Sequence, residues 1–113
     1  MKDMAALKCY ECAVKAEGQM DLILSILVKL HTLRSSSNQR EQEIGNAREV
    51  ALTALSEALN ETTMALNSTK EGRFGNIAEG LGSAIRLVER DKYYEAGDVV
   101  AKLASDHAAI SNQ

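Results

Sequence analysis

Residues 9–30 of the chain read CYECAVKAEGQMDLILSILVKL, and the apolar residues of this stretch recur at alternating steps of four and three. The row consists of Cys9, Ala13, Ala16, Met20, Ile23, Leu27 and Leu30. A repeat that averages 3.5 residues places these side chains along one side of a helix, in the register of helices that pack as a bundle. The stretch therefore predicts a long helix with one packed face.

Three further segments show similar spacing. Residues 39–69 carry the row Leu52, Leu55, Leu59, Thr62 and Leu66, with Ala47, Ala51, Ala54 and Ala58 beside it. Residues 73–90 carry Phe74, Ile77, Leu81, Ile85 and Val88, and residues 92–110 carry Tyr93, Ala96, Val100, Leu103, His107 and Ile110. The chain has no proline, and polar turns at 34–38, 71–76 and 90–91 separate the segments, with Asp91 expected to be the N-cap of the last helix. We predict an all-α fold, an up-down-up-down four-helix bundle with a long N-terminal hairpin and a shorter C-terminal hairpin, with residues 1–113 as a single domain.

The predicted helices differ in length. At 1.5 Å per residue the first two would each run roughly 45 Å and the last two about 27 to 30 Å, so the second hairpin cannot cover the first. Residues 22–33 (LILSILVKLHTL) are apolar nearly all round and are expected to be deeply buried. Either the first helix bends at Gly18 or a second copy covers it. We expect a homodimer, whose interface would contain Leu22, Ile23, Ile26, Leu27, Leu30 and Leu33.

Charge and composition exclude several classes of protein. The 113 residues include 16 acidic and 13 basic side chains, giving a net charge of -3, which argues against a nucleic-acid partner. The apolar run 22–33 contains Lys29 and His31 and is shorter than the roughly 20 residues that span a bilayer, so no membrane partner is expected. Two cysteines and no apolar signal segment favour the reducing cytoplasm.

Cys9 and Cys12 form a CxxC pair, which can act in thiol redox exchange or supply two metal ligands. In an up-down-up-down bundle the first helix begins at the end where the last helix finishes, so His107 approaches the level of both cysteines. We therefore consider a metal site at Cys9, Cys12 and His107. The alternative is that both cysteines are small hydrophobic packing residues and that His107 is a partly buried residue with satisfied hydrogen bonds.

Two glycines, Gly80 and Gly82, lie inside the third predicted helix and indicate close approach by a neighbouring element. A cavity near them, with Met20 or Met64 in its wall, would bind a small apolar ligand. The sequence presents no nucleophile, base and orienting group on one face, so neither an enzyme nor a cofactor is expected. The function predicted first is a small non-enzymatic interaction protein that presents a helical surface to a protein partner. The alternatives are an apolar-ligand-binding bundle and the thiol or metal site.

Residues 81–103 are similar to one tetratricopeptide unit in the pair Leu81-Gly82 and in Tyr93 and Ala96. Leu81 and Ala96 are 15 residues apart, however, which is longer than that pattern, and no second copy follows. No family is assigned on this basis. In size and composition the chain resembles the small helical proteins carried by bacterial mobile elements, which implies a bacterial accessory protein.

Overall fold

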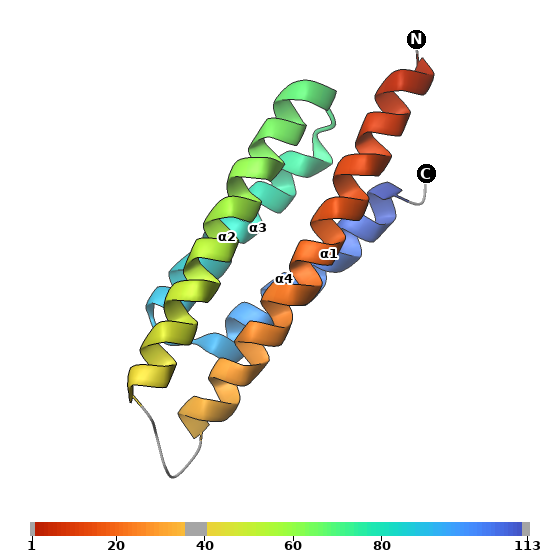
Figure 1. Cartoon of the computed structure of the whole chain (residues 1–113). Coiled ribbons are helices and arrows are strands. Elements are labelled where there is room, and N and C mark those ends of the chain that lie inside the picture. The colour runs from red at the N-terminus through yellow and green to blue at the C-terminus, as the bar shows by residue number, and fades with distance from the viewer. Residues whose placement is uncertain (1, 36–40, 112–113) are drawn as a thin grey trace.

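The computed structural model describes residues 2–35 and 41–111, with side chains described for residues 12, 14–16, 18–35 and 41–110. This part of the chain forms four helices: α1 (Lys2–Ser35), α2 (Glu41–Thr69), α3 (Arg73–Glu89) and α4 (Tyr93–Ser111). Each helix packs on two neighbours, α1 on α2 and α4, and α3 on the same two. Successive helices run in opposite directions, and both termini lie at one end of the bundle (Figure 1). The predicted fold class is confirmed.

The two hairpins have unequal lengths, as predicted. α1 and α2 contain 34 and 29 residues, whereas α3 and α4 contain 17 and 19. The molecule is elongated, with dimensions of 57 × 20 × 17 Å. α1 continues as a helix through Gly18, where an added Cβ would meet no other atom within 4 Å. Within the described residues, no helix has both the length and the apolar character needed to cross a membrane.

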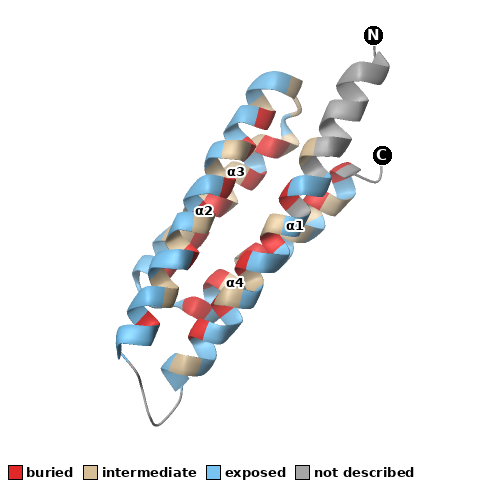
Figure 2. Cartoon of the chain, viewed as in Figure 1, coloured by how far each residue is buried: buried red, intermediate tan, exposed pale blue. Residues whose placement is uncertain are grey.

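One apolar core runs between the helices (Figure 2). The row predicted for the last helix is fully confirmed, because all six of its members are buried: Tyr93, Ala96, Val100, Leu103, His107 and Ile110. From α1 the core receives the predicted residues Ala16, Met20, Ile23, Leu27 and Leu30, whereas Cys9 and Ala13 lie outside the described side chains. From α3 it receives Phe74, Ile77, Leu81, Ala84 and Val88. Ile85, predicted for this row, is only partly buried, and Ala84 replaces it.

The buried face of α2 differs from the prediction. Its buried residues are Ile44, Ala51, Leu55, Ala58, Thr62 and Ala65, whereas Leu52, Leu59 and Leu66 are only partly buried at the edges. Alanines occupy the line of closest approach because a small side chain allows a neighbouring helix to come near, and the longer leucines reach the core from the side. Leu55 and Thr62 of the predicted row are therefore confirmed as buried, whereas its other three leucines flank the centre of the face.

The expectation that residues 22–33 are deeply buried is also wrong in part. Leu22 and Val28 are 63% and 59% exposed, whereas Ile23, Leu27 and Leu30 are buried. Among the described helices, α1 contacts only α2 and α4, and the described side chains of α1 that point away from both, such as Leu22 and Val28, are open to solvent.

The turn between α3 and α4 joins three helices at one end of the bundle. Asp91 adopts a positive φ of 60° and lies two residues before Tyr93, so it does not hold the predicted N-cap position of α4. Its carboxylate lies 3.9 Å from Nη2 of Arg34 and 3.8 Å from Nε of Arg48, and it accepts a 2.6 Å hydrogen bond from the hydroxyl of Tyr93. Burial, followed by this hydrogen bond, raises the pKa of Tyr93 to about 12. The buried Tyr93 hydroxyl is therefore satisfied.

Gly80 shows the close approach that the sequence predicts, and Gly82 does not. A Cβ at Gly80 would lie 2.6 Å from Cδ2 of Leu103 on α4, whereas the nearest atom at Gly82 is the flexible guanidinium of Arg86, 3.7 Å away. Leu103 is only 4% exposed, so it has little room to move aside. The glycine at position 80 is thus required by the contact between α3 and α4.

We predict that Gly80→Ala lowers the free energy of unfolding by about 1–2 kcal/mol, because overpacking against Leu103 outweighs the better helix propensity of alanine. Gly18→Ala is the matched control, since the added methyl group meets open space, and it should raise the free energy of unfolding by up to about 1 kcal/mol. Urea denaturation of both variants measures the difference. Equal stabilisation by the two substitutions would show that the α3–α4 contact is loose.

Candidate functional site

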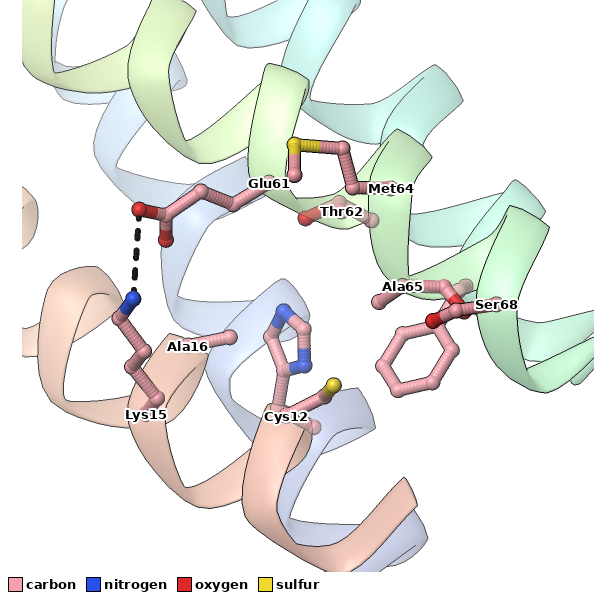
Figure 3. Close-up of a pocket in the computed structure, with 10 residues that line it drawn as sticks. Cys12, Lys15, Ala16, Glu61, Thr62, Met64, Ala65 and Ser68 are labelled. Atoms are coloured by element: carbon pink, nitrogen blue, oxygen red, sulfur yellow. Dashed lines mark hydrogen bonds and ion pairs between the residues drawn. The ribbon is translucent and has the colours of Figure 1, made fainter. Parts of the chain in front are cut away.

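A pocket of about 290 Å³ lies between α1, α2, α4 and the start of α3. Its lining residues are Cys12, Lys15, Ala16, Glu61, Thr62, Met64, Ala65, Ser68, Phe74 and His107. Cys12, Lys15 and Ala16 come from α1, and the run from Glu61 to Ser68 comes from the facing part of α2 (Figure 3). Most of the lining is carbon.

The pocket exists because small side chains face one another. On α2 the buried row at this level is Ala58, Thr62 and Ala65, and the residues opposite on α1 are Cys12 and Ala16. None of these side chains is long enough to fill the space between two helix backbones that the longer core residues hold apart. The pocket therefore depends on small residues on both helices, α1 and α2, and not on the sequence of one helix alone.

His107 is the unusual residue of this site. It is 0% exposed, and neither ring nitrogen has a hydrogen-bond partner among the described residues. The nearest ring is that of Phe74, with centroids 6.1 Å apart and planes inclined at 46°, which offers no hydrogen bond. A buried polar group without a partner costs roughly 1–3 kcal/mol, so this arrangement is unfavourable unless something else occupies the pocket.

Burial also sets the charge of the ring. It lowers the pKa of His107 from 6.5 to about 4, and the neighbouring Asp106 carboxylate only partly opposes this effect. His107 is therefore neutral at physiological pH, with one nitrogen as a donor and the other as an acceptor. This differs from the predicted state, a partly buried histidine with satisfied hydrogen bonds.

Charged residues meet on one side of the pocket. Nζ of Lys15 lies 3.5 Å from Oε1 of Glu61, which joins α1 to α2 across the site (Figure 3). Gln19 Nε2 donates a 2.6 Å hydrogen bond to the other carboxylate oxygen of Glu61. Lys15 and Glu61 are thus paired with each other at this side of the pocket, and His107 is the polar group buried against the rest of the described lining.

The predicted metal set is brought together only in part. Cys12 and His107 line the same pocket, but the side chain of Cys9 lies outside the described residues. Over the side chains that the structure describes, no three His, Cys, Asp or Glu residues are grouped so that they could hold a metal ion. The three-residue metal site stays a prediction.

Of the residues predicted to bind a ligand, only Met64 lines this pocket. Met20 is fully buried in the core, and Gly80 and Gly82 lie on α3 away from the lining. Cys12 and His107 belong to the predicted metal set. The remaining lining residues were not predicted from the sequence as ligand-binding residues: Lys15, Ala16, Glu61, Thr62, Ala65, Ser68 and Phe74. One sequence feature could have indicated this pocket: Thr62 is a polar residue in an apolar row, and Ala58 and Ala65 lie on the same face of the helix.

The predicted interface residues divide into two groups. Ile23, Leu27 and Leu30 lie in the core of the chain itself, so internal packing accounts for their apolar character. Ile26 and Leu33 are partly buried against that core, and Leu22 is 63% exposed. Of the six, Leu22 is therefore the residue most available to a second chain.

A second apolar pocket of about 230 Å³ lies between α1 and α4, near the other end of the bundle. His31 and Tyr94 stand at its edge with ring centroids 5.4 Å apart, and His31 is exposed. None of the buried unpartnered polar atoms found in the described residues belongs to its lining. The first pocket is therefore the better candidate site.

We predict that His107 makes stability fall as the pH drops. Its folded-state pKa lies below its unfolded value of 6.5, so the unfolded chain takes up a proton first, and stability is lost between about pH 6.5 and pH 4. At pH 4.5 this loss is on the order of 2–3 kcal/mol relative to pH 7. His107→Leu should remove it, which urea denaturation at both pH values measures.

His31→Leu is the control for this experiment, because it removes the other histidine of the chain, which is exposed. His31→Leu should therefore lose stability between the two pH values by the same amount as the wild-type protein. If the wild-type protein and His107→Leu lost stability in parallel from pH 7 to pH 4.5, the assignment of a buried neutral ring would be wrong.

Comparison with known proteins supplies no role for these residues. No protein-family model, curated protein or solved structure matches the chain. The function of the pocket therefore has to be argued from its own side chains.

Proposed function

We propose that the protein is a small helical binding module that holds an apolar small molecule in the pocket between α1, α2 and α4. The observation that carries this proposal is the burial of His107 against the pocket with both ring nitrogens unpartnered among the described residues. A mostly apolar ligand with one polar group would form a hydrogen bond with a ring nitrogen of His107 and would also pack against the apolar lining. The function involves binding without a chemical step.

The pocket is large enough for a two-ring molecule. An engineered apolar cavity of about 150 Å³ is known to hold benzene, and the volume here is 290 Å³. A ligand of about ten non-hydrogen atoms that gains roughly 0.5 kcal/mol per atom would bind with a dissociation constant on the order of 0.1–1 mM. Naphthalene is therefore a suitable probe of the pocket.

The location proposed from the sequence, the reducing cytoplasm, suits this site. Cys12 lines the pocket and forms no disulfide with another described residue. A reducing compartment keeps such a thiol from oxidation, which would place a polar group in the apolar wall.

We predict that naphthalene, titrated in NMR spectra, shifts signals of residues around the pocket and that Ser68→Phe abolishes this binding, because the added ring occupies the site. Ser25→Phe is the matched control: Ser25 and Ser68 both donate a hydrogen bond to a carbonyl of their own helix, and Ser25 is exposed on α1 outside the pocket. Native mass spectrometry of the purified protein shows whether a cellular ligand is retained. Unchanged binding in Ser68→Phe would contradict the proposal.

The second candidate function is the interaction protein that the sequence analysis placed first, a homodimer that presents a helical face to a protein partner. The observation in its favour is the exposure of Leu22 and Val28, two large apolar side chains on the outer side of α1. They are separated by polar residues such as Ser25, so the apolar surface is broken, which makes this candidate the weaker one.

We predict that, if this candidate is correct, size-exclusion chromatography with light scattering finds a dimer at tens of micromolar protein and that Leu22→Lys dissociates it, because a charge would be buried at the interface. Asp21→Lys is the control, because it introduces a lysine at the adjacent exposed position and shows whether added positive charge alone dissociates the dimer. A wild-type monomer would reject the homodimer and leave the ligand-binding proposal intact.

A further inference from the structure

We infer that the ligand of this pocket carries an uncharged hydroxyl group that hydrogen-bonds to a ring nitrogen of His107, with an apolar body lying between α1 and α2. The inference rests on the proposed function and names the chemistry of its ligand. The contrast between the mostly apolar lining and His107, which is buried against it with both ring nitrogens unpartnered among the described residues, supports this chemistry.

A hydroxyl group fits His107 in either of its neutral forms. One ring nitrogen of neutral imidazole accepts a hydrogen bond and the other donates one. A hydroxyl group can donate to the first or accept from the second, so the match does not depend on which nitrogen carries the proton. A hydrocarbon would leave both nitrogens without partners.

A charged ligand fits the pocket less well. The low pKa of His107 means that the ring carries no positive charge with which to pair an anion near pH 7. Nζ of Lys15, the cation among the described lining residues, lies 3.5 Å from Oε1 of Glu61, and the Glu61 carboxylate also accepts a hydrogen bond from Gln19. An anion would have to displace Glu61 from Lys15 and lose its own hydration at the Phe74 side of the pocket.

Met64 lies at the exposed edge of the pocket. His107 has no exposed surface, so neighbouring side chains must shift before a ligand touches it. Met64 lines the pocket and is 60% exposed, and its unbranched side chain rotates easily (Figure 3). We expect this side chain to be among those that move when a ligand enters the pocket.

The test compares 1-naphthol with naphthalene, which differ by one hydroxyl group, in the wild-type protein and in His107→Leu at pH 7. Dissociation constants come from NMR titration. We expect the wild-type protein to bind 1-naphthol at least tenfold more tightly than naphthalene. In His107→Leu the order should reverse, because the hydroxyl group is then desolvated without a partner. The variant should fold, since it replaces an unpartnered buried polar group with an apolar one.

Each other result overturns a different statement. Equal or tighter binding of naphthalene to the wild-type protein would refute the hydroxyl ligand and leave the apolar pocket in place. The same preference for 1-naphthol in both proteins would assign the hydrogen bond to a group other than His107. Tighter binding of 1-naphthoate than of 1-naphthol would show that the ligand is an anion. Binding of none of these probes would reject the proposed function as well.

Discussion

The burial of a polar ring in the apolar row of α4 is the constraint on which the account of this site depends. Five members of that row have mainly apolar side chains that pack in the core. One of them, Tyr93, also donates a hydrogen bond from its hydroxyl to Asp91. His107 belongs to the same row and is as deeply buried, yet no described residue offers it a hydrogen bond. The two ends of α4 therefore differ: at one end the Tyr93 hydroxyl is hydrogen-bonded to Asp91, and at the other end His107 borders the pocket without a hydrogen-bond partner among the described residues.

Much of the fold follows from spacing along the sequence. The row from Tyr93 to Ile110 and the core residues of α1 were predictable because a repeat averaging 3.5 residues specifies both the helix and its buried side. The ends of the helices were predictable as well, since the chain has no proline and its polar turns are few. The close contact between α3 and α4 was predictable as well, because it requires a glycine at position 80 inside a helix.

Other features depend on pairs of helices and could not be predicted from either helix alone. Alanines take up half of the buried face of α2 because they allow close approach of a neighbouring helix. A search for large apolar residues finds the buried Leu55 but also selects the flanking Leu52, Leu59 and Leu66. The exposure of Leu22 and Val28 follows from α1 having only two neighbours. The pocket arises where Ala16 and Cys12 face Thr62 and Ala65, a coincidence of small residues about 50 positions apart in the sequence.

The most direct test of the account is a high-resolution crystal structure of the protein as purified from cells, without added ligand. We expect a bound molecule in the pocket between α1 and α2, larger than water, with a polar atom within hydrogen-bond distance of a ring nitrogen of His107. A pocket closed by side chains, with His107 hydrogen-bonded to another residue of the chain, would contradict it.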